Sequence, residues 1–311
     1  MPRRPLQRVQ AALAARRYFI GQQTKSQIAE ALGISRFKVA RLIDAAIGQR
    51  IIEFVINEPD DLNAELGEAV RSRYGLKAAL VLDGDDMSTS ELTTPLGNLA
   101  ASLLDETLAD GQLVGVAWGR TLAAMAKALG HLPKVDVVQV AGAPLGLEIS
   151  QNPVELVHRL ASRSGGNGYP VYGPMWTEDP VLAQRLRQEP AVATAMAKYD
   201  DIDVLVVGIG SWSPAESCLC SGFPAEWRRA ALAAGVQADL CGTLIDREGR
   251  EQPSQLDTQG LTITSAQLRR IPDVIGIGGG LQKADAILAV LRGEWIDILV
   301  TDAGVARRLL A

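Results

Sequence analysis

Two glycine-containing loops carry residue types suited to binding an anion, and the first spans residues 117–121. In this loop Gly119 permits close approach of the backbone to a ligand, Arg120 offers a forked cation to an oxyanion, and Thr121 adds a hydroxyl. A helix is expected to begin at Thr121, so the positive end of its dipole would face the same point. The loop therefore predicts anion binding at the start of a helix.

The second loop covers residues 278–283 and reads Gly-Gly-Gly-Leu-Gln-Lys. Its glycines are expected to expose backbone N–H groups that form an anion nest. Lys283 lies in the first turn of the next predicted helix, where side chains lean toward the N-terminus, so its charge reaches the nest. A protonated amine beside an anion is preferred there to a Schiff base with an aldehyde. Such turns are often structural, but two of them strengthen the prediction.

Further glycine-rich or acidic turns also follow strand-like segments. Gly208 and Gly210 belong to the sequence Gly-Ile-Gly-Ser, and Asp239 begins the sequence Asp-Leu-Cys-Gly. The Asp239 carboxylate is expected to accept hydrogen bonds from sugar hydroxyls. Ordinary turn formation is the alternative for each, and for Asp302 capping of the following helix is the preferred role.

The elements that would position these loops alternate between strands and helices from about Leu62 onward. Continuous apolar segments predict strands at 78–82, 113–117, 135–141, 204–209, 274–277 and 298–301, as in a parallel sheet buried on both faces. Helices are expected at 91–109, 121–129, 153–163, 180–187, 225–234, 283–291 and 303–310. This alternation predicts an α/β fold with a Rossmann-like parallel sheet, in which ligands bind at the carboxyl ends of strands.

Charge divides the chain into a basic head and an acidic body. Residues 1–56 hold 10 Arg or Lys and 3 Asp or Glu, a net charge of +7, whereas the remainder holds 21 basic and 33 acidic residues, a net charge of −12. A basic head on an acidic body predicts that the head meets a polyanion. A soluble basic helical bundle is the alternative. The boundary is expected in the polar segment 57–61, which links a head of residues 1–56 to a body of residues 62–311.

The head has the spacing of a helix-turn-helix over residues 27–42. After a helix expected over 7–19, Thr24 and Ser35 are expected to cap the second and third helices, with Gly33 at the turn. In the third helix the apolar residues include Phe37, Val39 and Leu42, and the segment 51–56 is expected to form a short strand. A helix pair that contacts another protein is the alternative. The residues expected to face DNA phosphates and base edges are Gln27, Ser35, Arg36, Lys38 and Arg41.

Composition limits the classes of protein that the chain can represent. Its 311 residues are 47% hydrophobic and 22% charged, as in a soluble globular protein of one large or two modest domains. No apolar segment approaches the roughly 18 residues of a membrane helix, and no signal peptide is recognisable. Three Cys and two His favour neither a disulfide framework nor a metal site. A cytoplasmic protein without cofactor, metal or membrane partner is therefore expected.

Over nearly its whole length the chain resembles the SorC family of bacterial sugar-responsive transcription regulators. The resemblance rests on residues 27–42, 119–121, 203–210, 238–249, 278–291 and 299–310. It implies a helix-turn-helix, a sugar-binding domain related to phosphosugar isomerases, and a homotetramer or homodimer on double-stranded operator DNA. The family often has Ser at position 40 and Gly at position 50, where this chain has Ala40 and Arg50. The resemblance also implies phosphate contacts from Gly119, Arg120, Thr121, Gly279, Gly280 and Lys283.

Three functions follow as hypotheses. The first is a DNA-binding transcription regulator whose operator affinity is controlled by a phosphorylated sugar. The second is a sugar-phosphate isomerase or hydrolase, because the same fold hosts many functions. No acid–base pair stands out in the sequence, so no catalytic residue and no enzymatic activity are expected. The third is an architectural DNA-binding protein without effector, whose melting temperature no metabolite would change.

Overall fold

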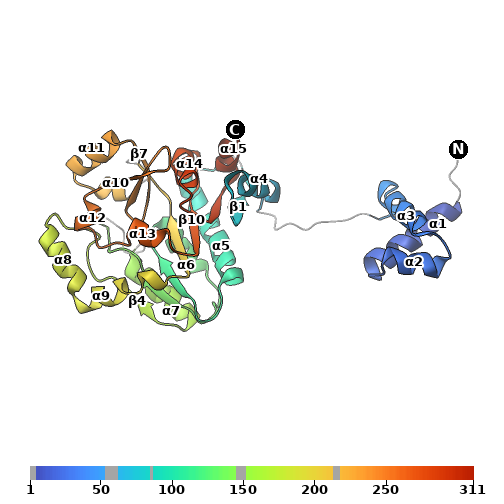
Figure 1. The fold of residues 1–311 in the computed structure, drawn as a ribbon, viewed down its shortest axis with the longest axis horizontal. Helices are drawn as coiled ribbons and strands as arrows, with labels where there is room; N and C mark the ends of the chain where they lie inside the picture. The colour runs from blue at the N-terminus through green and yellow to red at the C-terminus, as the bar shows by residue number, and fades with distance from the viewer. Residues whose placement is uncertain (1–4, 53–61, 85–86, 145–151, 213–217) are drawn as a thin grey trace. The chain divides into compact units, whose positions relative to one another are not determined.

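The computed structural model describes residues 5–52, 62–84, 87–144, 152–212 and 218–311. The chain divides into two compact units, Met1–Glu58 and Pro59–Ala311 (Figure 1). Among the described residues, no helix combines the length and the apolar character that crossing a bilayer requires.

The N-terminal unit is a small helical bundle. Its elements are α1 (Pro5–Ala15), a π-helical turn η1 (Arg16–Ile20), α2 (Lys25–Leu32) and α3 (Arg36–Gly48). Ile28, Val39 and Ala46 are among the buried residues of its core. The predicted helix over 7–19 is therefore confirmed in position, although its last turn is π-helical rather than α-helical.

The predicted caps of the helix-turn-helix are confirmed. The Thr24 hydroxyl accepts a hydrogen bond from the backbone N–H of Gln27, and the Gln27 side chain accepts one from the Thr24 N–H, which completes a capping box. Gly33 takes the left-handed conformation with φ 62°. The Ser35 hydroxyl accepts from the backbone N–H of Lys38 at 3.2 Å. These caps fix where α2 begins and ends and where α3 begins.

Four residues of this unit have a conformation or an exposure that the sequence did not predict. Ile51 and Ile52 form a bend rather than a strand and pack half-buried against the core of the bundle; residues 53–56 of the predicted strand lie outside the described residues. Phe37, grouped by sequence with the apolar residues of the third helix, is 82% exposed. Arg50, at the position where the family often has Gly, adopts φ 51°, a conformation that favours glycine.

The C-terminal unit is built on a seven-stranded parallel sheet. Its strand order is β1-β11-β10-β5-β2-β3-β4. The six predicted strands are confirmed, and the two-residue β4 was not predicted. The strand bounds are β1 (Ala78–Leu82), β2 (Leu113–Val116), β3 (Asp136–Gln139), β4 (Gly168–Tyr169), β5 (Val204–Gly208), β10 (Asp273–Ile277) and β11 (Ile298–Asp302).

Helices pack around this sheet, and α4 and α15 lie beside the edge strand β1 (Figure 1). The seven predicted helices are confirmed to within a few residues. The bounds are α4 (Ala64–Tyr74), α5 (Thr89–Thr107), α6 (Arg120–Ala128), α7 (Pro153–Ser164), α8 (Pro180–Gln188), α9 (Pro190–Met196), η3 (Tyr199–Asp201), α10 (Cys218–Gly222), α11 (Ala225–Ala233), α12 (Leu256–Gln259), α13 (Ser265–Leu268), η4 (Leu281–Lys283), α14 (Ala284–Arg292) and α15 (Ala303–Leu310).

A second, antiparallel sheet was not predicted. It consists of β6 (Gly210–Ser211), β7 (Val236–Leu240), β8 (Thr243–Asp246) and β9 (Glu251–Gln252), in that order. Asp239 therefore lies within a strand and not in a turn. The turn that follows is Cys241-Gly242, where φ is 50° and 97°, as in the two-residue hairpins that require positive φ at both positions. β6 begins two residues after β5 ends, so the second sheet continues directly from the first.

Candidate functional site

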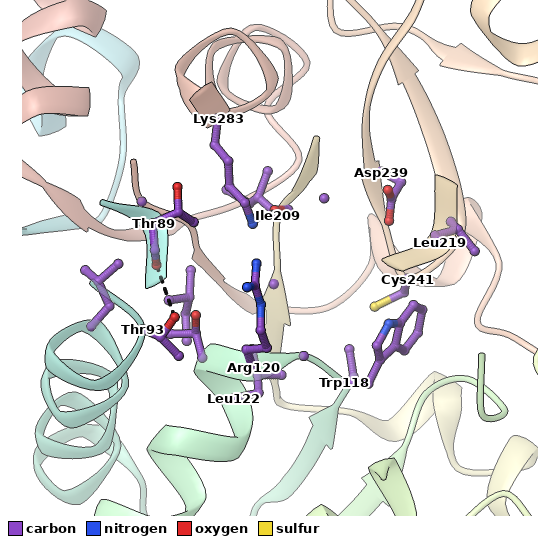
Figure 2. Close-up of a pocket in the computed structure, with 18 residues that line it drawn as sticks. Thr89, Thr93, Trp118, Arg120, Leu122, Ile209, Leu219, Asp239, Cys241 and Lys283 are labelled. Carbon is purple, nitrogen blue, oxygen red and sulfur yellow. Dashed lines mark hydrogen bonds between the residues drawn. The ribbon is translucent and has the colours of Figure 1, made fainter. Parts of the chain in front are cut away.

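A cavity lies beside β2 and β5, the two adjacent strands from which successive strands are added in opposite directions across the main sheet (Figure 2). β2 and β5 are neighbours, but β2 continues to β3 on one side while β5 continues to β10 on the other. Ligands in open α/β sheets bind in the crevice that opens at such a switch point, outside the carboxyl ends of the strands. The loops after β2, β5 and β10 line the cavity, together with the start of α5 and the end of β7.

Eight of the nine residues that the sequence predicts for a ligand line this one cavity. Residues far apart in the chain are thus brought together by the strand order. The eight are Gly119, Arg120, Thr121, Gly208, Gly210, Asp239, Gly279 and Lys283.

Gly280 is the ninth predicted residue, and it does not line the cavity in the described structure. Its N–H donates a hydrogen bond to Asp302 Oδ2 at 2.7 Å. The N–H of Gly278 donates to the carbonyl oxygen of Val300 at 3.1 Å. The predicted nest of three free glycine N–H groups is therefore wrong for these two glycines, because β11 and the residue that ends it accept their hydrogen bonds.

Two cations enter the cavity from different elements. Arg120 opens α6, and Lys283 lies at the junction of η4 and α14. Figure 2 shows their side chains pointing toward one another across the cavity. Lys283 Nζ donates a hydrogen bond to the carbonyl oxygen of Ile209 at 3.0 Å, which holds the ammonium group beside the loop after β5. No side chain of the described residues caps α6, so its positive N-terminal end adds to the two charges.

The other end of the cavity carries a buried carboxylate. Asp239 is 4% exposed, and its Oδ1 accepts a hydrogen bond from Trp212 Nε1 at 3.1 Å. Only glycine fits at Gly210, because a Cβ there would lie 2.2 Å from Asp239 Oδ1. The neighbouring Cys241 is buried, and burial together with the charge of Asp239 raises the pKa of its thiol. At neutral pH this thiol is therefore neutral and is not a nucleophile.

Hydroxyl groups from α5 line the cavity as well, and the sequence analysis missed them. Thr89 and Thr93 both face it, and Thr93 Oγ1 donates to the carbonyl oxygen of Thr89 at 3.1 Å (Figure 2). The signal that would have located this helix start is the capping box formed by Ser88 and Glu91. The cavity thus offers two cations, with the threonine hydroxyls on one side of them and the Asp239 carboxylate on the other (Figure 2). Such a set recognises a small molecule with one anionic group and several hydroxyls.

The structure also shows where Asp302, the two histidines and Cys220 lie. Asp302 caps α15, as expected, by accepting from the Val305 N–H at 3.2 Å. His131 and His158 are exposed, and Cys220 is buried. Within the described part of the chain, no three His, Cys, Asp or Glu side chains are grouped as a metal site would require.

The N-terminal unit presents the residues predicted to contact DNA on its surface. Arg36, Lys38 and Arg41 are exposed along α3. Ser35 caps α3, as described above. Gln27 is exposed, but its Oε1 accepts from the Thr24 N–H at 2.9 Å. Its carbonyl oxygen is thus used to start α2, which leaves the three cations of α3 as the stronger candidates for nucleic-acid contact.

Known proteins resemble this chain along nearly its whole length. A family model for a sugar-binding domain matches residues 60–311. The sorbitol operon regulator of Klebsiella pneumoniae is 29% identical over 95% of this chain and 96% of its own. The transcriptional regulator LsrR of Klebsiella pneumoniae subsp. pneumoniae is 30% identical over 94% of this chain and 90% of its own. The crystal structure of the full-length sorbitol operon regulator SorC from Klebsiella pneumoniae has a TM-score of 0.74 at 28% identity, covering 97% of this chain and 98% of that one.

Proposed function

The chain belongs to the SorC family of sugar-binding transcriptional regulators, and on that premise we propose that a phosphorylated sugar in the cavity controls binding of the N-terminal unit to operator DNA. The observation that carries this proposal is the convergence of Arg120 and Lys283 in a cavity at the switch point of the sheet. Chromosomal DNA is the partner, so the proposal includes a cytoplasmic location.

The cations are suited to a phosphate for electrostatic reasons. A phosphate monoester carries close to two negative charges at neutral pH and three acceptor oxygens. Arg120 can donate two parallel hydrogen bonds to it, while Lys283 adds a point charge. The N-terminal end of α6 favours the same anion. A phosphate brings negative charge to these two cations and to the end of α6, which a neutral sugar does not, so a phosphorylated effector fits better than a free sugar.

The acidic side is suited to the sugar itself. Asp239 lines the cavity, and its hydrogen bond from Trp212 Nε1 orients the carboxylate, which is a suitable acceptor for a sugar hydroxyl. Thr89 and Thr93 add hydroxyls along the wall. Buried polar groups that orient a ligand also reject analogues that lack the matching hydroxyl. We therefore assign specificity for the sugar to the Asp239 side and affinity for phosphate to the Arg120 side.

The N-terminal unit is assigned to DNA through α3. The second helix of a helix-turn-helix enters the major groove, and dimers of such units bind half-sites about one helical turn, or roughly 34 Å, apart. A homodimer or homotetramer is part of the proposal, because paired units match paired half-sites. If the effector binds one arrangement of the subunits more tightly, it changes the spacing of the units and hence operator affinity.

An isomerase or hydrolase on the same sheet is the competing function. Proton transfer in such enzymes needs an acid and a base within hydrogen-bond reach of the substrate. Asp239 is the one carboxylate among the described lining residues, and the Cys241 thiol is neutral. The proposal therefore gives the cavity a sensing role.

A binding assay on the upstream region of the protein's own operon tests the proposal. Fluorescence anisotropy is measured at fixed moderate salt, with and without a panel of sugar phosphates and their unphosphorylated forms. We expect a specific complex whose affinity changes with one sugar phosphate, and the same compound should raise the melting temperature by mass action. Absence of any specific complex would refute the regulator assignment, and turnover of the sugar phosphate would favour the enzyme.

A further inference from the structure

Phe37 is an aromatic residue exposed in the middle of a cationic surface. It is 82% exposed and lies at the second position of α3, between the exposed residues Arg36 and Lys38. Single exposed apolar residues are common and by themselves mean little. Phe37 is informative because of its position relative to the buried face of α3.

Helix geometry places Phe37 at the centre of the exposed face of α3. Successive residues of an α-helix are about 100° apart around its axis. The buried residues of α3 are Val39, Leu42, Ile43 and Ala46, and Phe37 lies about 170° from the centre of that buried face. The bundle therefore gains no packing from this ring.

The cations of α3 are arranged around the ring. Arg36 lies about 100° to one side of Phe37 and Lys38 about 100° to the other, while Arg41 lies only about 40° away, one turn further along. A helix in the major groove has phosphates on both flanks and base edges in front of it. Arg36 and Lys38 therefore face the two phosphate walls, whereas Phe37 and Arg41 face the floor of the groove.

We propose that Phe37 reads a thymine by packing its ring against the 5-methyl group in the major groove. The inference rests on the proposed function, because it requires that α3 enters the groove. The thymine methyl is the apolar group that base pairs present on this edge, and phenylalanine is among the side chains that contact it. N-terminal residues of recognition helices are those that reach base edges, and Phe37 occupies such a position.

Removal of single methyl groups from the operator tests the inference. The bound segment of the upstream region is first mapped by footprinting with the full-length wild-type protein. Each thymine in it is then replaced by deoxyuridine, and the affinities of wild-type protein and Phe37→Ala are measured by anisotropy. We expect one thymine per half-site at which replacement by deoxyuridine lowers the affinity of the wild type about fourfold. This factor corresponds to the transfer free energy of one methyl group. For Phe37→Ala the same replacement should have no effect.

The controls separate failure of the inference from failure of the proposed function. Val9→Ala removes methyl groups from another exposed side chain, on α1, and should reproduce the wild-type deoxyuridine profile. Circular dichroism and melting of Phe37→Ala should match the wild type, because the ring packs against no core. If no fragment is bound, the regulator function itself is wrong. The thymine contact is overturned if the operator is bound but every deoxyuridine replacement changes the affinities of wild type and Phe37→Ala equally. It is also overturned if the variant differs from the wild type only in its oligomeric mass.

Discussion

At the scale of single residues, the division of the cavity into a cationic and an acidic side has consequences for specificity. Lys283 and Arg120 are separated by more than 160 positions in the sequence, yet they line one cavity because β2 and β10 flank β5. Charge-assisted hydrogen bonds are about twice as strong as neutral ones. The phosphate is therefore expected to dominate the affinity and the hydroxyl contacts to select the sugar.

Replacement of one cation should weaken binding of the phosphorylated ligand alone. In Lys283→Gln we expect the Kd of the sugar phosphate, measured by calorimetry, to rise at least about tenfold, because a hydrogen bond to a charged group contributes about 1.5–3 kcal/mol. Binding of the unphosphorylated sugar should stay unchanged. Lys127→Gln, an exposed lysine of the same α6 that Arg120 opens, is the control and should bind as the wild type. Equal losses for both sugars would contradict the placement of the phosphate.

At the scale of elements, the parallel sheet could be predicted and the antiparallel sheet could not. Strands buried on both faces are continuous apolar segments, as in β5 and β11, and this signal does not depend on the rest of the chain. β6 and β9 have two residues each, too few for any periodicity. β7 contains Gln237 and Asp239, which interrupt its apolar pattern. Asp239 was therefore assigned to a turn, although its role in the site was predicted from the same tetrapeptide.

The candidate site was largely predictable because strand ends can be located from sequence. Once the strands are placed, the residues that follow them must meet at one edge of the sheet. The loop at residues 278–280 shows the limit of that reasoning. Its glycines indicate free backbone N–H groups, but Asp302, 22 residues further along the chain, accepts a hydrogen bond from the Gly280 N–H. Only the register of β10 against β11 shows this pairing. Likewise, the apolar character of Phe37 is visible in sequence, but its outward direction depends on where the bundle core lies.

The turn between β8 and β9 should make folding of the second sheet depend on pH. Asp246 is buried and accepts hydrogen bonds from the backbone N–H of Glu248 and from Arg250 and Gln252. Burial alone would raise the pKa of its carboxyl group, but the hydrogen bonds and charge of Arg250 outweigh it, and the pKa is lowered. The carboxylate therefore stabilises the fold above about pH 4, the pKa expected in the unfolded chain, and this contribution is lost as pH falls through the lower folded value.

Urea unfolding at several pH values checks this expectation. At pH 7, Asp246→Asn should lower the free energy of unfolding by about 1–3 kcal/mol, because the hydrogen bonds of this turn lose their charged acceptor. The difference from the wild type should shrink as the pH falls below about 4, because the carboxyl of the unfolded chain is protonated there and that of the folded chain only at lower pH. Glu251→Gln, an exposed acid on the neighbouring β9, is the control and should change little. A difference that is constant with pH would exclude this carboxylate as the titrating group.

At the scale of the whole molecule, the opposite charges of the two units should confine DNA binding to the N-terminal unit. Residues 1–56 carry +7 and the remainder −12, so the larger unit is repelled by the phosphates that attract the smaller one. The affinity for operator DNA is expected to fall steeply with salt. The logarithm of the binding constant should decrease linearly with the logarithm of the salt concentration, with a slope of about −0.9 for each phosphate contacted.

Single substitutions in α3 should separate phosphate contacts from base contacts in that slope. Arg36→Ala is expected to reduce its magnitude by about one and to weaken binding to all sequences similarly, because a phosphate contact carries no sequence information. Phe37→Ala should leave the slope unchanged while altering sequence preference. Anisotropy titrations on operator and unrelated DNA over a range of salt concentrations measure both quantities. An unchanged slope in Arg36→Ala would remove that residue from the phosphate contacts.

The proposed coupling between effector binding and DNA binding leads to a final prediction, which does not depend on whether the effector releases or recruits DNA. If a sugar phosphate changes operator affinity by some factor, thermodynamic linkage requires that operator DNA change the affinity for that sugar phosphate by the same factor. Anisotropy gives the first factor and calorimetry with saturating operator gives the second. Lys283→Gln should bind operator as tightly as the ligand-free wild type but respond only at much higher sugar phosphate, whereas Arg41→Ala should bind the sugar phosphate normally and lose operator affinity. A factor of one in both measurements would show that the cavity and α3 are not coupled, because neither ligand would then change the affinity for the other.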